Sequence, residues 1–130
     1  MANPTITISS TTTGVSNDST TNDASIELTF TSSESTTNFV AGDITVSGGT
    51  LSNFGAASGM GGPSTTVYTA TLTPSGSGQR TQATTVDVVQ GVFTDAAGNG
   101  NIAGTQFKWT FDNVPVAVSK QADGIFSGSP

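Results

Sequence analysis

Hydrophobic and polar residues alternate at a period of two along much of this chain. The pattern is clearest over residues 106–111, where every second residue is aromatic. Successive side chains of a strand point to opposite faces, so the three rings share one face, and that face has to be buried. The rings belong to Phe107, Trp109 and Phe111. The pattern predicts a strand whose inner face seals the core.

Six other segments show the same alternation or a short β-branched run, and none shows the period of an amphipathic helix. We expect these strands at residues 4–10, 24–30, 43–46, 51–54, 68–72 and 86–93. The polar segment Thr11–Asp23 is predicted to be a loop, and the glycine-rich segment Gly55–Ser64 a mobile loop. Phe39 and Val40 are expected to be buried. About seven short strands joined by turns predict an all-β fold, an immunoglobulin-like antiparallel β-sandwich.

Composition excludes several classes of function. The chain has no cysteine and no histidine, so the sandwich has no disulfide, and catalytic sites or zinc sites that need those residues are excluded. Its net charge of −6 disfavours nucleic acid and anionic lipid as partners and also disfavours self-association, so we expect a monomer. No apolar run approaches the roughly 20 residues that span a bilayer, so membrane insertion is not expected.

The segment Asp95–Asn101 is the main candidate for a binding site. It places Asp95, Asn99 and Asn101 in a short polar loop between two apolar runs, and carboxylate and amide oxygens are the ligands that calcium prefers. A structural role explains the same residues: Asp95 and Asn99 could hydrogen-bond a tight turn in which Gly98 and Gly100 adopt positive φ. The sequence leaves both interpretations open.

A short echo suggests a repeat. Pro4 and Pro115 are each followed by small and β-branched residues and then by serine. Since the stretch between them matches the length of one sandwich, we predict one domain over residues 1–113, with 114–130 as a linker, the start of a following repeat or a disordered tail. When the two prolines are aligned, Asp112 falls on position 1, the start of the next repeat. In a tandem chain, the Asp112 of one repeat would therefore meet the 95–101 loop of the repeat that follows it. A chance match is the alternative.

Four blocks in this order resemble the bacterial Ig-like repeats of very large cell-surface proteins, including biofilm and RTX-type adhesins. The blocks are Pro4–Ile8, Phe39–Phe54, Tyr68–Pro74 and Phe93–Asn101, and the resemblance extends from Pro4 to about Asn113. It implies a secreted or cell-surface module that acts as a non-catalytic spacer between neighbouring repeats of the same chain. It also implies calcium at domain junctions, for which Asp95, Asn99, Asn101 and Asp112 are the candidate ligands, divided between two half-sites.

Two other functions fit the sequence less well. Enzymatic activity is not expected, because the acidic residues are scattered without the paired arrangement of a glycosidase. The alternative function is a ligand-binding module that recognises a glycan or a host protein. Glycan modules stack sugars on exposed rings, whereas Trp109 and Tyr68, the only residues of their kinds, fall on faces predicted to point inward.

Overall fold

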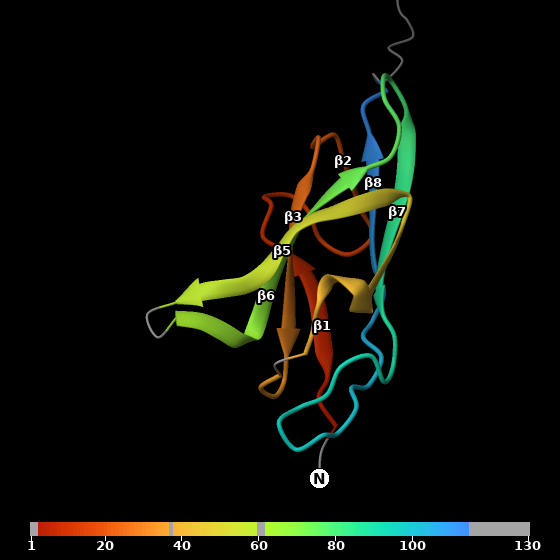
Figure 1. The fold of residues 1–130 in the computed structure, drawn as a ribbon. Coiled ribbons are helices and arrows are strands. Elements are labelled where there is room, and N and C mark those ends of the chain that lie inside the picture. The colour runs from red at the N-terminus through yellow and green to blue at the C-terminus, as the bar shows by residue number, and fades with distance from the viewer. Residues whose placement is uncertain (1–2, 37, 60–61, 115–130) are drawn as a thin grey trace, which may run out of the picture.

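Two four-stranded sheets pack face to face in the computed structural model, which describes residues 3–36, 38–59 and 62–114 (Figure 1). The predicted immunoglobulin-like sandwich is confirmed. One sheet has the order β1-β3-β6-β5 and is antiparallel throughout; the other has the order β2-β8-β7-β4, with β2 parallel to β8. Without β2, this is the strand order of a constant-type immunoglobulin domain. The strands are β1 (Ile6–Ser10), β2 (Ser19–Thr21), β3 (Ile26–Ser32), β4 (Ile44–Ser47), β5 (Gly49–Gly59), β6 (Gly62–Pro74), β7 (Thr81–Val88) and β8 (Phe107–Asp112).

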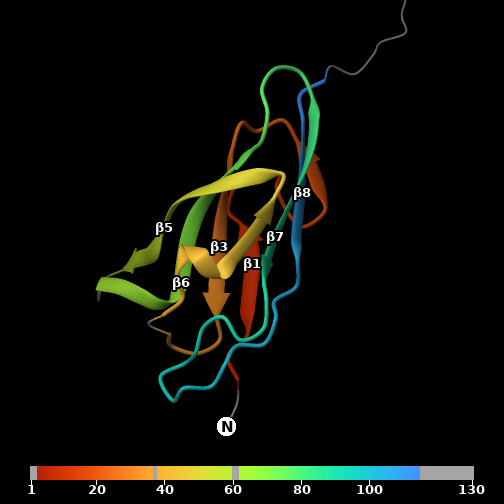
Figure 2. The same cartoon turned by 45° about the vertical axis from the view of Figure 1, so that its right-hand side comes forward.

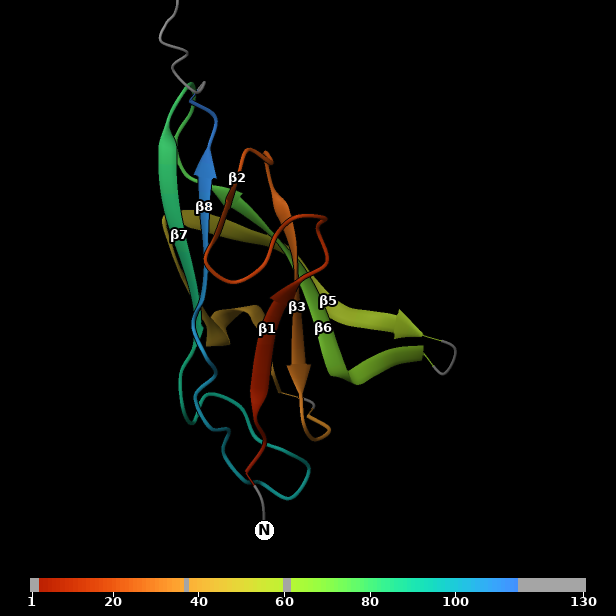
Figure 3. The same ribbon diagram turned by 180° about the vertical axis from the view of Figure 1, so that it is seen from behind.

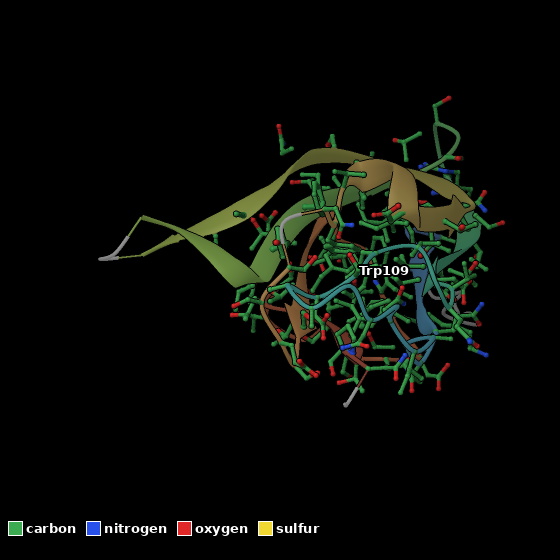
Figure 4. The ribbon with its side chains drawn as sticks, turned by 60° about the horizontal axis from the view of Figure 1, so that its bottom comes forward. Trp109 is labelled. Atoms are coloured by element: carbon green, nitrogen blue, oxygen red, sulfur yellow. The ribbon has the colours of Figure 1, made fainter. Side chains whose placement is uncertain are left out.

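The aromatic face of β8 lies at the centre of the core, as predicted. The side chains of Phe107, Trp109 and Phe111 are 2%, 0% and 5% exposed. Figure 4 shows Trp109 between the two sheets. Lys108, which alternates with these rings, points to solvent. The period-two pattern therefore identified both faces of this strand correctly.

Five further rings pack against one another between the sheets. Phe39 is the hub, with ring centroids at 4.9 Å from Phe93 and 5.1 Å from Tyr68. The Tyr68 hydroxyl donates a hydrogen bond to the carbonyl of Thr36 at 2.9 Å, which satisfies its polar end inside the core. The cluster consists of Phe30, Phe39, Phe54, Tyr68 and Phe93.

The prediction that Phe39 and Val40 are both buried is only half right. Phe39 is 3% exposed, whereas Val40 is 53% exposed. Val40 caps the 3-10 turn η1 (Ala41–Asp43): its N–H donates to the Asp43 carboxylate, and its carbonyl accepts from the Asp43 N–H. The extended backbone at Val40 therefore turns its side chain away from the ring cluster that holds Phe39.

The mobile loop predicted over Gly55–Ser64 is wrong for residues 55–59 and 62–64, which belong to β5 and β6; residues 60–61 lie outside the described residues. The two strands pair as a long hairpin that leaves the body of the sandwich (Figures 1 and 3). Register shifts occur between Ser52 and Gly55 and between Ala56 and Ser58. Strand pairing needs only backbone N–H and C=O groups, which glycine also has, so a glycine-rich segment can pair where a partner lies opposite it.

The strand predicted at residues 86–93 is displaced. The observed strand β7 spans Thr81–Val88, and residues 89–106 form a long connection to β8 with one isolated bridge between Thr94 and Gly100. Phe93 is buried, with 1% exposed, but as an anchor of this connection and not as part of a strand. A buried apolar residue can therefore extend a strand pattern past the point where backbone pairing stops.

The segment Thr11–Asp23, predicted to be a loop, contains the short strand β2. Its pairing runs from Ser19, opposite Trp109, to Thr21, opposite Phe111. The indole N–H of Trp109 donates to the Thr21 hydroxyl at 2.9 Å, so β2 covers the polar edge of the central ring. A polar three-residue strand has too little hydrophobic alternation to be recognised in a sequence.

The chain enters and leaves the domain at opposite ends of its long axis (Figures 1 and 2). At the entry end, the Asn3 amide donates to the Gly100 carbonyl at 2.7 Å and the Ile102 N–H donates to the Pro4 carbonyl. We call this end the N-terminal pole; it comprises Asn3, Pro4, Glu34 and the 95–101 loop. The C-terminal pole comprises the turn 75–80 and residues 112–114. The segment predicted as a linker, second repeat or tail lies outside the described residues from position 115 onward.

Candidate functional site

The 95–101 loop lies at the N-terminal pole beside Asn3 and Pro4. Within it, the Asp95 carboxylate organises a tight turn. One carboxylate oxygen accepts the backbone N–H groups of Ala97 and Asn99, both at 2.9 Å, and the other accepts the Asn99 side-chain amide at 3.1 Å. Gly98 has a φ of +87°, which glycine adopts without strain, whereas Gly100 does not have the predicted positive φ.

Asn101 lies at the base of the loop with 1% of its surface exposed. Its amide oxygen accepts the N–H groups of Val92 and Phe93 at 2.8 and 3.0 Å, and its amide nitrogen donates to the carbonyls of Val89 and Ile102. These contacts give four backbone groups of an irregular connection the partners that a sheet would otherwise supply. Since its oxygen already accepts two hydrogen bonds, Asn101 is poorly placed to bind a cation.

Glu34, which follows β3, is the residue that sequence reasoning missed at this pole. Burial, a hydrogen bond with the Asp95 side chain and repulsion by its negative charge raise the pKa of Glu34. The pKa of Asp95 is held below its ordinary value, chiefly by the backbone and side-chain amides of Asn99. The two carboxyl groups come from distant parts of the chain, so no local sequence motif predicts that they lie together.

Replacing Glu34 with glutamine is expected to stabilise the domain at neutral pH. Because the pKa of Glu34 is raised in the folded state, the folded domain holds the proton of the Glu34 carboxyl group more tightly than the unfolded chain does. The stability of the domain therefore falls as the pH rises through that raised pKa. An uncharged amide avoids this loss. Thermal melting between pH 4 and pH 8 should show the gap between Glu34→Gln and the parent widening as the pH rises.

Glu27→Gln is the control, because it removes the same charge from an exposed position on β3. A constant gap across this pH range for Glu34→Gln would contradict the prediction. Asp95 should behave in the opposite sense: its pKa is lowered in the folded state, so its contribution is present at neutral pH and is lost as the pH falls through that value.

Asp112, the fourth predicted ligand, lies at the C-terminal pole. One of its carboxylate oxygens accepts the N–H of Val114 at 3.0 Å. Beside it, the Asn113 side chain accepts the Arg80 N–H at 2.6 Å and donates to the Gly78 carbonyl. The Arg80 guanidinium stacks on the Phe111 ring, 4.6 Å from its centroid. The structure therefore brings Asp95, Asn99 and Asn101 together and separates Asp112 from them.

Calcium binds six to eight oxygen ligands, so it needs more than either pole offers alone. Within the described ranges, no three acidic side chains gather closely enough to hold a metal ion. The pair Glu34 and Asp95 brings two carboxyl groups together, and burial, followed by the hydrogen bond with Asp95 and its negative charge, raises the pKa of Glu34. Glu34 is a further carboxyl group beside Asp95, whereas the amide oxygen of Asn101 already accepts two hydrogen bonds, and calcium binding at this pole stays a prediction.

The two rings suited to sugar stacking are not at the surface. Trp109 is 0% and Tyr68 6% exposed, as the sequence predicted. Neither ring can therefore present a face to a glycan. No helix among the described residues is long and apolar enough to cross a membrane.

Comparison with known proteins adds one match. A family model described as a bacterial Ig-like domain matches residues 1–111. No curated protein and no solved structure matches the chain. The matched range ends within β8, so it contains both sheets and the whole 95–101 loop.

Proposed function

The chain belongs to the bacterial Ig-like domain family, and on that premise we propose that it is a spacer repeat of a multi-domain bacterial surface adhesin. Domains of this family are typically non-catalytic structural modules and are usually extracellular or on the cell surface. The proposal is that this domain separates an adhesive tip from the cell, with neighbouring repeats of the same chain as its partners.

The observation that carries this proposal is where the chain enters and leaves the domain. Asn3 is held at one pole by Gly100, and Asn113 is held at the other by Arg80 and Gly78. In Figures 1 and 3 these poles lie at opposite ends of the elongated sandwich. A domain whose ends leave at opposite poles adds its full length to a tandem chain, whereas ends at one pole would fold the chain back.

We extend the proposal to calcium at the junction between repeats. The N-terminal pole offers the Asp95 and Glu34 carboxylates. In a tandem chain, the C-terminal pole of the preceding repeat, with its own Asp112, would face this pole. Each carboxylate that faces the junction adds ligands and negative charge for a hard cation. Calcium, when bound, would neutralise this charge and stiffen the joint.

The test is thermal melting with and without calcium, on this domain and on a chain of two linked repeats. At a calcium concentration about 100 times the dissociation constant, binding should raise the melting temperature of the linked repeats by roughly 5–10 °C. The single domain, which holds two incomplete halves, should change little. Asp95→Ala should abolish the gain, whereas Asp87→Asn, on β7 and hydrogen-bonded to Gln106, should preserve it.

Small-angle scattering on the linked repeats tests the spacer itself. An extended and narrow distribution of lengths supports the proposal, and a flexible pair with or without calcium contradicts it. If the linked repeats are extended but gain no stability from calcium, the calcium part of the proposal is wrong and the spacer part stands. Specific binding of a glycan or host protein by the single domain would favour the ligand-binding alternative.

A further inference from the structure

The first strand and the crossover that follows it place strict demands on five positions. Ile6, Ile8 and Val15 are buried, with 4%, 9% and 7% of their surfaces exposed, so these positions need apolar side chains. Gly14 and Asp18 have φ values of +83° and +71°. Left-handed backbone of this kind is adopted freely only by glycine and, at some cost, by asparagine or aspartate.

Residues 113–130 meet all five demands when they are aligned with residues 3–20, so that Asn113 falls on Asn3. We call this alignment the asparagine register. The buried positions receive Val116, Val118 and Ile125. The two left-handed positions receive Gly124 and Gly128, the second of which replaces an aspartate by the residue that fits best.

The same five demands disfavour the alternative alignment, in which Pro115 falls on Pro4. In that proline register the Ile6 and Ile8 positions would receive Ala117 and Ser119, which are too small to fill the core. The left-handed position of Gly14 would receive the β-branched Ile125. A β-branched residue at positive φ is strained, so the proline register fails at three of the five positions.

We infer that residues 113–130 are the first strand and crossover of a second domain of the same fold, so that one repeat runs from residue 3 to residue 112. The inference deepens the proposed function and rests on it. The surface that fits this segment is the edge of β3 in another copy of the domain, where β1 pairs Ile6 with Ser32 and Ile8 with Phe30. The partner is therefore a sandwich of this kind and not an unrelated protein.

The asparagine register leaves almost no linker between domains. Asn113 closes the first domain through Arg80 and Gly78, and its counterpart Asn3 contacts Gly100 at the start of the domain. One asparagine thus stands at the end of one repeat and at the start of the next. Only Asn113, Val114 and Pro115 separate the end of β8 from the residue aligned with Ile6, so the joint is short and stiff.

Two segment exchanges in the full chain test the register. In the first, residues 113–125 replace residues 3–15; in the second, residues 115–126 replace residues 4–15, so that the prolines coincide. The first should fold cooperatively with a loss of about 10 °C, because it exchanges isoleucine for valine at two buried positions and loses the Thr5 N–H that donates to Ser33. The second should melt at least about 15 °C below the first, because it puts alanine and serine at these positions.

Equal melting temperatures, or a more stable second exchange, would overturn the inference. If neither exchange folds, a longer chain decides: residues 1–128 followed by residues 19–114 complete a second domain in the asparagine register. Its calorimetric unfolding enthalpy should be roughly double that of the parent chain, because this enthalpy scales with the number of folded residues. An unchanged enthalpy would show that the segment does not begin a domain.

These outcomes are separable from failure of the spacer role. If the exchanges contradict the register while linked repeats still scatter as extended rods, the inference falls and the spacer function stands. If the register is supported but the completed two-domain chain is flexible in scattering, the bounds of the repeat stand and the spacer function falls.

Discussion

Replacing Asn101 with alanine is expected to lower the free energy of unfolding by about 3–4 kcal/mol, because each buried backbone group left without a partner costs roughly 1–3 kcal/mol. The substitution removes the partner of four backbone groups: the Phe93 N–H is buried, and the Val92 N–H and the carbonyls of Val89 and Ile102 are partly buried. Entry of water should recover part of this loss. Urea denaturation in the presence of a calcium chelator measures the effect without any contribution from a metal.

Asn99→Ala is the matched control at this loop. It removes one side-chain hydrogen bond, from the Asn99 amide to Asp95, and leaves the backbone contacts of the turn in place. We expect a loss of about 1 kcal/mol or less, the usual net contribution of one hydrogen bond. If Asn101→Ala costs no more than Asn99→Ala, Asn101 does not hold the connection between β7 and β8.

Trp109→Ala should destabilise the domain by about 3–5 kcal/mol, the range for removing a large buried ring. Trp109 is fully buried, packs edge-on against Phe111 at 6.2 Å between ring centroids, and lies on the central strand β8. Its removal leaves a cavity between the two sheets and takes away the hydrogen bond that the indole donates to the Thr21 hydroxyl, which keeps its contact with Asp23. Because a domain typically has a net stability of roughly 5–15 kcal/mol, this loss removes a large part of the stability of the folded state.

Two milder variants separate the packing of the indole from its hydrogen bond. Trp109→Phe retains most of the ring contacts but loses the bond to Thr21. Thr21→Val loses that bond, and the bond from the Thr21 hydroxyl to Asp23, while the indole stays in place. Thr21→Val should cost about 1–3 kcal/mol, because it leaves a buried N–H without a partner. Equal losses for Trp109→Ala and Thr21→Val would mean that the hydrogen bond, and not core packing, gives this residue its importance.

The candidate site shows where sequence reasoning reached its limit. The sequence marks Asp95 and Asn99 as turn-builders or ligands, and the structure shows the turn, while their contribution to calcium binding stays a prediction. Glu34 could not be placed beside Asp95 in advance, because the two residues come from distant parts of the chain. Asn101 looked like a ligand because an asparagine in a polar loop has the same sequence signature whether its amide faces solvent or binds buried backbone.

The amino-acid sequence by itself determined the fold class, the buried face of β8 and the inward position of both Trp109 and Tyr68. These features follow from side-chain alternation, which is a local property of an extended chain. Only the tertiary structure decided the limits of β7, the extension of β5 and β6 through a glycine-rich segment, and the asparagine register that we infer for the repeat. Those features depend on which backbone groups find partners across the sheets and on which positions are buried or left-handed, and both are set by contacts between residues far apart in the chain.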